Sequence, residues 1–399
     1  MKSEWKKVLL GDVCTKITSG GTPKSSFPNY YGGDIPWLRT QEINFSDIER
    51  TELHITQEGL NNSSAKWIPA NAVIVAMYGA TAGKSAISKI PLTTNQACCN
   101  LVIDESKADF RYIYYQLKLD YEKLASLANG GAQQNLNARI ISDYELNLPD
   151  LPTQRVISDT LYALDEKIAN NKKVNHHLAA AAQAVFERLI IEDALDEPLG
   201  VLSDIAVINP LRPLQKGKEA RYIEMANLPT SGSFPSNWTK RAFSGGMKFK
   251  NGDTIMARIT PCLENGKTAY INFLGADEIA FGSTEYIVIA PKPSYCNEMF
   301  YFFARNSDFL SYAVKNMNGS SGRQRISGDA IGAYELHIPS RKNVEEFAEL
   351  ARPVMETIAH NALENRNLAD IRDTLLPRLM SGELSVADLA KFTRERKTS

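Results

Sequence analysis

Two different patterns of apolar and polar positions alternate along this chain. In residues 1–150 and 199–340, short apolar runs are bounded by Gly, Pro and Asn, which predicts β-strands. The expected strands are 73–77, 101–103, 254–259 and 286–289, with short helices at 110–119 and 298–305. Strands and helices mixed in this way predict two α+β globules.

After each globular stretch the apolar pattern changes to a heptad seam. Over residues 157–189, apolar side chains recur at alternating steps of four and three, which predicts a coiled-coil helix. A helix over 154–190 is roughly 55 Å long at 1.5 Å per residue. Adding 190 to each position gives a second seam, 347–379, in which only Arg372 is out of pattern.

Two asparagines lie in the middle of each seam. Buried asparagine at a and d positions lowers stability but fixes the register and the partner of a coiled coil. Because the pairs match at a constant offset, we expect the two long helices to pair antiparallel within one chain, Asn171 meeting Asn365 and Asn175 meeting Asn361. Pro353 is expected to kink the second helix or to mark where its early part ends.

The globular stretches repeat each other as well. Three pairs of segments align, at offsets of 190, 181 and 186: 130–149 with 320–339, 71–78 with 252–259, and 100–103 with 286–289. A repeat of this length indicates one architecture used twice. We therefore expect an internal pseudo-two-fold arrangement of globule, long helix, globule and long helix.

The segment "MYGATAGKSA" (77–86) ends like a phosphate-binding loop. Such a loop needs a glycine five residues before the glycine of its GK[ST] ending, and a helix after it. Tyr78 occupies that glycine position, and the β-branched residues after Lys84 predict a second strand. The matching segment, 260–269, has Pro261 there and keeps Lys267. Both copies therefore predict hairpin loops with a glycine–lysine pair, and no nucleotide site.

Length and composition narrow the class of protein. A chain of 399 residues with 43% hydrophobic residues is long enough for two or three domains. No apolar stretch has the length of a membrane span. The five cysteines form no CxxC pair and have no histidine at zinc-ligand spacing, so we expect no metal site and reduced thiols in a cytoplasmic protein. The net charge of −1 carries no basic signature, although residues 199–340 hold 15 Lys and Arg against 12 Asp and Glu.

Catalytic motifs give no support for an enzyme. Pro149-Asp150 followed by Asp165-Glu166-Lys167 imitates a PD…DxK nuclease signature, but its second half lies in the heptad helix, away from any strand. Neither NPP[YF] nor DPP[YF], the methyltransferase tetrapeptides, is present. No nucleophile–base pair can be nominated. We therefore predict no catalytic residue in this chain.

Over essentially its whole length, the chain resembles the specificity subunits of type I restriction–modification systems. The order and duplication of several segments carry this resemblance: "LGDVCTKITSGGTPK" (10–24), "RYIYYQL" (111–117), "YELNLP" (144–149) with "YELHIP" (334–339), "GSTEYIVI" (282–289) and "LLPRLMSGEL" (375–384). It implies four segments: a first target-recognition domain (1–152), a first spacer helix (153–195), a second target-recognition domain (196–341), and a second spacer helix with a tail (342–399).

The resemblance also implies a division of labour. Each globule reads one half of a split site in double-stranded DNA. The helices set the gap between the halves and dock two modification (methyltransferase) subunits, which restriction subunits join. S-adenosylmethionine, ATP and Mg²⁺ then belong to those partners, and this chain binds no cofactor. A coiled-coil scaffold that binds protein partners is the alternative; unequal polar loops in the two globules favour two DNA readers.

Candidate DNA contacts lie in polar loops that match between the globules. Arg and Lys suit guanine, Asn and Gln suit adenine, and backbone and cationic groups suit phosphate. We single out 133–135 and 323–325 as the strongest candidates. The full set is Gly20, Gly21, Thr22, Lys24, Arg39, Thr81, Lys84, Gln133, Gln134, Asn135, Arg258, Thr260, Lys267, Ser283, Thr284, Arg323, Gln324 and Arg325.

Overall fold

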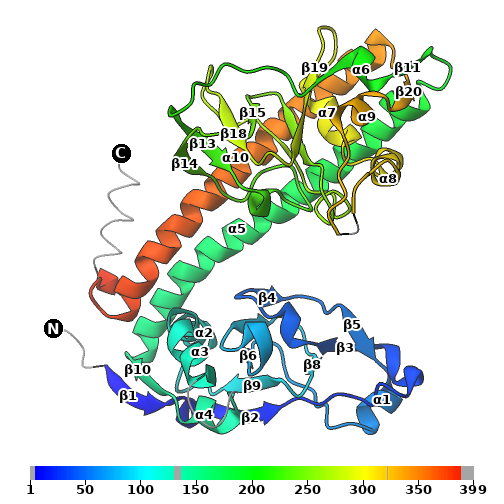
Figure 1. Cartoon of the computed structure of the whole chain (residues 1–399). Helices are drawn as coiled ribbons and strands as arrows, with labels where there is room; N and C mark the ends of the chain where they lie inside the picture. The colour runs from blue at the N-terminus through cyan, green and yellow to red at the C-terminus, as the bar shows by residue number, and fades with distance from the viewer. Residues whose placement is uncertain (1–4, 130–135, 321, 388–399) are drawn as a thin grey trace. The chain divides into compact units, whose positions relative to one another are not determined.

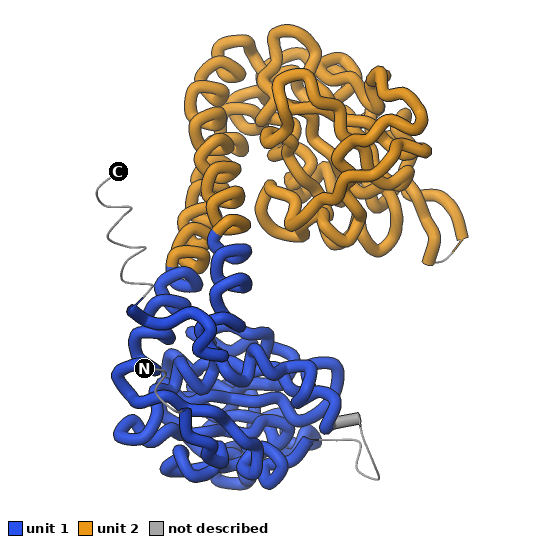
Figure 2. Tube along the Cα trace, turned by 90° about the vertical axis from the view of Figure 1, so that its left-hand side faces the viewer, with its two compact units in different colours: residues 1–166, 368–399 blue, residues 167–367 orange. Residues whose placement is uncertain are grey.

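The computed structural model describes residues 5–129, 136–320 and 322–387. The chain forms two compact units (Figure 2): unit 1 comprises Met1–Glu166 and Leu368–Ser399, and unit 2 comprises Lys167–Asn367. Each unit joins one globule to a part of both long helices, and the division into four segments remains a prediction. Each globule mixes helices and sheets, as expected for an α+β fold (Figure 1).

The globule of unit 1 contains strands in the orders β2-β9-β6-β7-β4, β5-β3-β8 and β1-β10. The bounds are β1 (Lys6–Leu9), β2 (Cys14–Ser19), β3 (Tyr31–Leu38), β4 (Asp47–Ile48), β5 (Leu53–Ile55), β6 (Val73–Ala76), β7 (Ser85–Ser88), β8 (Thr93–Thr94), β9 (Cys98–Ile103) and β10 (Glu145–Leu148). The short helices are η1 (Leu10–Val13), η2 (Pro28–Tyr30), η3 (Thr40–Glu42), α1 (Gln57–Asn61), η4 (Gly79–Thr81), α2 (Phe110–Leu119), α3 (Tyr121–Asn129) and α4 (Ala138–Ser142). The strands expected at 73–77 and 101–103 and the helix at 110–119 are confirmed.

Buried apolar side chains explain these elements. All four residues of β6 are buried, as in a strand covered on both faces. Helix α2 starts where Asp109 accepts hydrogen bonds from the backbone N–H groups of Arg111 and Tyr112, which satisfies donors that a helix start leaves free. The buried face of α2 packs on the sheet with Leu376 and Leu379 of the second long helix.

The globule of unit 2 repeats this plan, with strand orders β12-β19-β16-β17, β14-β13-β18-β15 and β11-β20. The strands are β11 (Leu199–Val201), β12 (Ala206–Ile208), β13 (Glu219–Ile223), β14 (Thr239–Ala242), β15 (Met247–Phe249), β16 (Thr254–Ala257), β17 (Thr268–Tyr270), β18 (Ala280–Gly282), β19 (Tyr286–Pro291) and β20 (Glu335–His337). The short helices are α6 (Leu202–Ile205), η6 (Met225–Asn227), α7 (Asn297–Phe303), α8 (Ser307–Lys315) and α9 (Gly328–Gly332). Expected elements at 254–259, 286–289 and 298–305 are confirmed with small shifts of their ends.

Strand pairing corrects one alignment of the repeat. In β6 and β9, Val73 pairs with Leu101; in β16 and β19, Thr254 pairs with Ile289. Since Val73 and Thr254 correspond at the offset of 181, Leu101 corresponds to Ile289, an offset of 188 and not 186. A slip of two residues keeps every side chain on the same face of a strand, so the apolar pattern alone fits both alignments.

The two long helices pair antiparallel, as predicted. Helix α5 (Leu151–Phe186) continues into a π-helical segment, η5 (Glu187–Glu192), and α10 spans Arg341–Met380. In unit 2 the Asn171 amide donates to the side-chain oxygen of Asn365 (2.9 Å), and Asn361 donates to Asn175 (2.8 Å). These are the expected pairs; their role in fixing the register remains a prediction.

Two irregularities of the second seam have different outcomes. Helix α10 runs through Pro353 without ending, so the alternative in which Pro353 ends its early part is wrong, and the kink stays a prediction. Arg372 is explained in unit 1, where its guanidinium pairs with Asp165 of α5. The hydroxyl of Tyr115 donates to the same carboxylate (2.7 Å). Asp165 therefore joins α2, α5 and α10, and it serves as a structural acceptor.

Candidate nucleic-acid interface

Most candidate residues of unit 1 lie on loops at one edge of its sheets, which we call the first loop face (20–24, 39–44, 77–84 and 94–97). Strands β2, β3, β6 and β8 all end there, and β9 begins there. Backbone hydrogen bonds join the loops: Gly21 N–H donates to Thr94 O (2.8 Å), and Asn95 N–H donates to Leu38 O (2.9 Å). The hydroxyl of Thr81 donates to Thr40 O (2.9 Å). The strand ends thus bring together segments that are far apart in sequence.

Two glycines of this face, Gly20 and Gly21, allow close packing of the backbone. A Cβ on Gly20 would lie 2.1 Å from Thr94 O, and one on Gly21 would lie 2.2 Å from the nitrogen of Ala65. Both glycines are buried, whereas Thr22 and Lys24 beside them are exposed. The close approach therefore positions the exposed side chains.

The equivalent second loop face comprises residues 224–228, 258–267, 282–285, 318–320 and 322–326. The backbone N–H of Arg258 donates to Glu285 O (3.0 Å), and that of Thr260 donates to Gln324 O (3.1 Å). The backbone N–H of Ile326 donates to Arg258 O (3.0 Å). The structure therefore brings together the candidates Arg258, Thr260, Ser283, Thr284, Gln324 and Arg325.

The glycine–lysine loops match in position, as predicted. Ala76 N–H donates to Lys84 O and Ala257 N–H donates to Lys267 O, each at 2.9 Å, and β7 follows the first loop as the expected second strand. The ammonium groups have internal partners: Lys84 donates to Asn44 Oδ1 (2.7 Å) and Lys267 to Met225 O (2.9 Å). Each lysine thus fastens its hairpin to a neighbouring loop of the same face.

Arg325 and Glu285 form a bidentate ion pair, with the Arg325 Nε and Nη2 atoms 2.8–3.0 Å from the Glu285 carboxylate oxygens. Hydrogen bonds from Arg325 hold the pKa of Glu285 below its ordinary value. Arg325 Nη1 also donates to Arg323 O (3.0 Å). The guanidinium therefore ties the 282–285 loop to residues 323–325, a connection that we call the lock. In unit 1, Ala97 and Asn135 correspond to this pair at offsets of 188 and 190, so the lock is specific to unit 2.

This lock predicts a pH dependence. A carboxyl whose folded pKa is depressed contributes stability above its unfolded pKa, and the contribution is lost as pH falls through the folded pKa. We expect the Arg325 side-chain N–H resonances to move as pH falls from the ordinary pKa of 4.5 to below the folded value. NMR titration measures this shift, and Glu285→Gln should abolish it. An identical titration in Glu285→Gln would contradict the assignment.

The remaining candidates differ in their surroundings. Arg39 lies on the first loop face and pairs with Glu52 (2.7 Å). Arg323 is exposed on the second face, and the Nε of Arg258 is buried without a hydrogen-bond partner. Gln133, Gln134 and Asn135 lie outside the described residues; Leu136, which follows them, donates its N–H to Met77 O (3.2 Å), just as Ile326 does to Arg258.

Two residues that the sequence analysis missed complete the first face. At the offset of 188, Asn95 and Gln96 correspond to Ser283 and Thr284. The side chains of Gln96 and Thr284 are both exposed, and the Thr22 hydroxyl donates to Gln96 Oε1. The polar run "TTNQ" (93–96) before β9 could have identified them from the sequence. The offset of 186 did not align Asn95 and Gln96 with the candidates Ser283 and Thr284.

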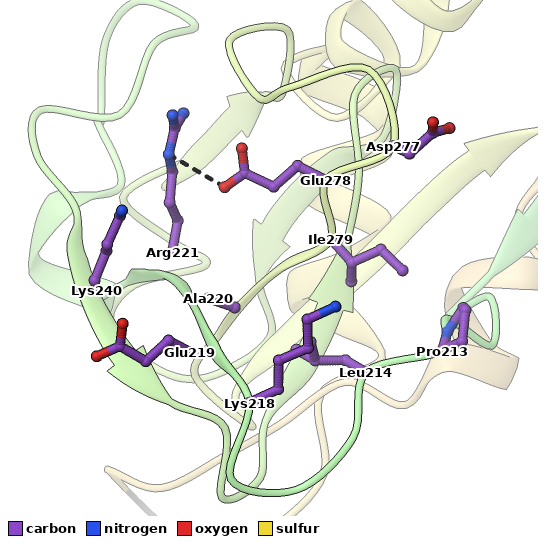
Figure 3. A pocket seen from close by; sticks show the side chains of 10 residues that line it. All are labelled: Pro213, Leu214, Lys218, Glu219, Ala220, Arg221, Lys240, Asp277, Glu278 and Ile279. Carbon is purple, nitrogen blue, oxygen red and sulfur yellow. Dashed lines mark ion pairs between the residues drawn. The ribbon is translucent and has the colours of Figure 1, made fainter.

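A cavity of about 520 Å³ lies in unit 2 (Figure 3), and none of the candidate residues lines it. Lys218, Arg221 and Lys240 line it opposite Asp277 and Glu278, and Arg221 pairs with Glu278 (3.2 Å). Its charges are mixed, and we assign it no role. In the described residues, no cluster of His, Cys, Asp or Glu side chains suits a metal ion, and every helix is too short or too polar to cross a bilayer.

Comparison with known proteins adds independent information. Residues 2–180 match the family described as type I restriction modification DNA specificity domain. The MjaIX specificity subunit of a type I restriction enzyme from Methanocaldococcus jannaschii is 25% identical over 420 residues, covering 97% of this chain and 95% of the relative. The HindI specificity subunit from Haemophilus influenzae is 28% identical over 471 residues, covering 96% and 100%. The S subunit of a type I restriction–modification system from M. genitalium has a similar fold, with a TM-score of 0.63 at 15% identity over 95% of this chain and 96% of that structure.

Proposed function

We propose that this chain is a specificity subunit of a type I restriction–modification system, as its similarity to such subunits over nearly its whole length supports, and that its two globules read the two halves of one bipartite site in double-stranded DNA. It is a non-catalytic subunit that gives the complex its DNA specificity. The two loop faces carry this proposal: they occupy equivalent places in the two units but present different side chains. Equivalent readers of unequal sequence suit an asymmetric site.

The long helices take the second role in this proposal. They set the gap between the half-sites and dock two modification subunits, which restriction subunits join. Repeated helices of matching register offer two similar faces, which suits two copies of one partner. S-adenosylmethionine, ATP and Mg²⁺ are held by those partners in the cytoplasm, and this chain supplies the DNA-reading side chains.

Methylation mapping tests the proposal. The chain is expressed with its modification subunit in a host that lacks DNA methylation, and modified adenines are located by sequencing. We expect one split motif with a fixed gap, absent when this chain is omitted. A soluble complex that methylates nothing would contradict the DNA-reading role and favour the protein-binding scaffold.

The loop faces predict that each half-site can be changed separately. Gln96→Ala should weaken discrimination in one half only, and Thr284→Ala in the other only. One lost base contact costs about 1–3 kcal/mol of discrimination, roughly tenfold or more. The same mapping measures both variants, each being the control for the other. Relaxation of both halves by one variant would show that the faces do not act as separate readers.

A further inference from the structure

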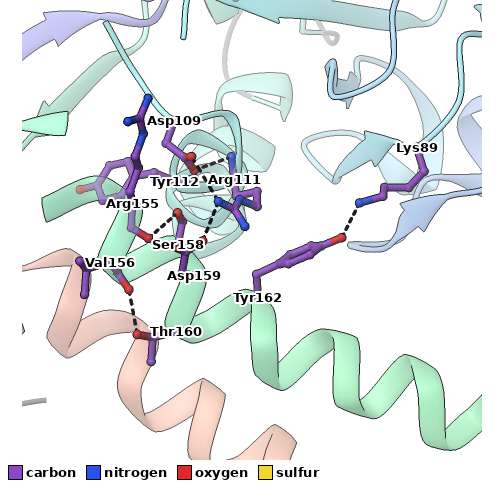
Figure 4. Close-up of polar contacts among 10 residues, drawn as sticks. All are labelled: Lys89, Asp109, Arg111, Tyr112, Arg155, Val156, Ser158, Asp159, Thr160 and Tyr162. Carbon is purple, nitrogen blue, oxygen red and sulfur yellow. Dashed lines mark hydrogen bonds and ion pairs between the residues drawn. The ribbon is translucent and has the colours of Figure 1, made fainter. Parts of the chain in front are cut away.

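The junction between globule and long helix differs between the two units. In unit 1, Tyr162 of α5 fills it (Figure 4). Its hydroxyl donates to Asp47 (2.6 Å) and accepts from the Lys89 ammonium (2.6 Å). The Arg111 guanidinium lies 5.4 Å from the centre of the tyrosine ring, a cation–π distance. One aromatic side chain and two cations thus close this junction.

The repeat identifies the matching residues of unit 2. Arg111 is the second residue of α2 after its N-cap, as Glu298 is in α7. In the first sheet Val73 pairs with Ile87, and Lys89 lies two residues after Ile87. In the second sheet Thr254 pairs with Tyr270, and Asn272 lies two residues after Tyr270. Tyr162 and Arg352 are both eleven residues after the first residue of their long helices. In unit 2, Glu298 therefore stands in place of Arg111, Asn272 in place of Lys89, and Arg352 in place of Tyr162.

These replacements leave a cavity of about 290 Å³ in unit 2, lined by Asn272, Glu298, Arg352 and Glu356 among others. Asn272 spans the junction and donates to Met355 O of α10 (3.0 Å). Arg352 and Glu356 are exposed at the helix surface, and within the described residues no ion pair joins Arg352 to Glu298. The place that the Tyr162 ring fills in unit 1 is thus open in unit 2.

One of the residues that line this cavity, Glu298, has a carboxylate oxygen without a hydrogen-bond partner. The residue is only 5% exposed. Its Oε1 accepts a hydrogen bond from the Tyr270 hydroxyl (3.1 Å), whereas its buried Oε2 has no partner. A buried carboxylate oxygen left unpaired is costly, and a cationic donor satisfies it best.

We propose that this cavity binds a small organic cation whose guanidinium or ammonium group pairs with Glu298 Oε2. The chemistry follows from the repeat, because the two cations of the first globule, Lys89 and Arg111, are replaced in the second by Asn272 and Glu298. Arg352 of α10 also lines the cavity, but it is exposed at the helix surface. The bound cation lies between the globule and α10 and closes the second junction as Tyr162 closes the first. This binding is independent of the DNA-reading role, which uses the loop faces.

Butylguanidine and its neutral counterpart butylurea test the proposal. Isothermal titration calorimetry on the full chain at physiological salt should detect binding of butylguanidine and none of butylurea. Butylamine distinguishes an ammonium from a guanidinium site. Saturating butylguanidine should also raise the unfolding temperature of unit 2, since a ligand that binds only the folded state stabilises it.

Three variants locate the site. Glu298→Gln keeps the acceptor for Tyr270 and should weaken butylguanidine binding by about tenfold or more. Arg352→Tyr restores the residue of the first repeat and should block the cavity, whereas Arg352→Gln leaves it open and should retain binding. Glu349→Gln, at an exposed carboxylate of α10, is the matched control. Equal heats for butylguanidine and butylurea, or binding unchanged by Glu298→Gln, would overturn the proposal, and methylation by the complex would be unaffected by that result.

Discussion

Phe186→Ala is expected to destabilise unit 2 by about 3–5 kcal/mol, the usual cost of removing a buried phenyl ring. The Phe186 side chain is fully buried, at 0% exposure. Its ring lies 5.0 Å from that of Phe303, 5.9 Å from Phe302 and 5.8 Å from Phe347. Because these rings belong to α5, α7 and α10, the substitution removes packing where the globule meets both long helices.

Urea unfolding followed by fluorescence measures this loss. Trp238 is the tryptophan of unit 2, and the other three, Trp5, Trp37 and Trp67, belong to unit 1. Trp37→Phe and Trp67→Phe reduce the unit 1 signal and serve as the background for the comparison. Leu211→Ala is the control, because Leu211 is 98% exposed and its loss should change stability little. A similar loss in both variants would contradict the assigned core.

Asp165→Leu is expected to destabilise unit 1 by about 3 kcal/mol, since it leaves the Tyr115 hydroxyl without its acceptor and removes one of the two carboxylates that pair with Arg372. The Asp165 carboxylate accepts from Tyr115 and Arg372, and Lys118 lies 4.0 Å from it. Burial and the Asp165 charge raise the pKa of Tyr115, so its hydroxyl remains a donor. The Arg372 side chain is 16% exposed and retains Asp373 as its other partner.

A double-mutant cycle separates the ion pair from simple packing. Replacing a buried ion pair by apolar residues of similar volume is often neutral, so Asp165→Leu with Arg372→Met should recover most of the loss. Thermal unfolding of the two single variants and the double variant gives the coupling energy. Additive losses would show that Asp165 and Arg372 do not depend on each other.

The sequence predicted the helices well because their pattern has a rigid period. The two heptad seams match at a constant offset of 190, with no insertion, so Asn171 corresponds to Asn361 and Asn175 to Asn365. An antiparallel arrangement of two such helices predicts the observed pairing of the amides. Arg372 was unpredictable for a physical reason. Its partner, Asp165, stands one place outside the seam, and an apolar pattern contains no information about a charge pair beside it.

The loop faces were predicted only in part. Lys84 and Lys267 were found because glycine marks both hairpins, and the hydrogen bonds of their carbonyls confirm the match. Gln96 was missed because strands repeat every two residues, so an alignment shifted by two fits the apolar pattern equally well. The hydrogen-bond partners of Lys84 and Arg325 could not be predicted either, because they lie on loops that are distant in sequence and come together only in the folded sheet. Their contacts with DNA remain predictions.

The first globule draws part of its core from the far end of α10, through Leu376, Leu379 and Met380. During translation these residues are added more than two hundred residues after Glu166, where the first stretch of unit 1 ends. Unit 2 is one uninterrupted stretch, so all of its residues leave the exit tunnel earlier than the last part of unit 1. The globule that is synthesised first is therefore the one completed last, and the nascent chain carries an unfinished apolar surface while the rest is made.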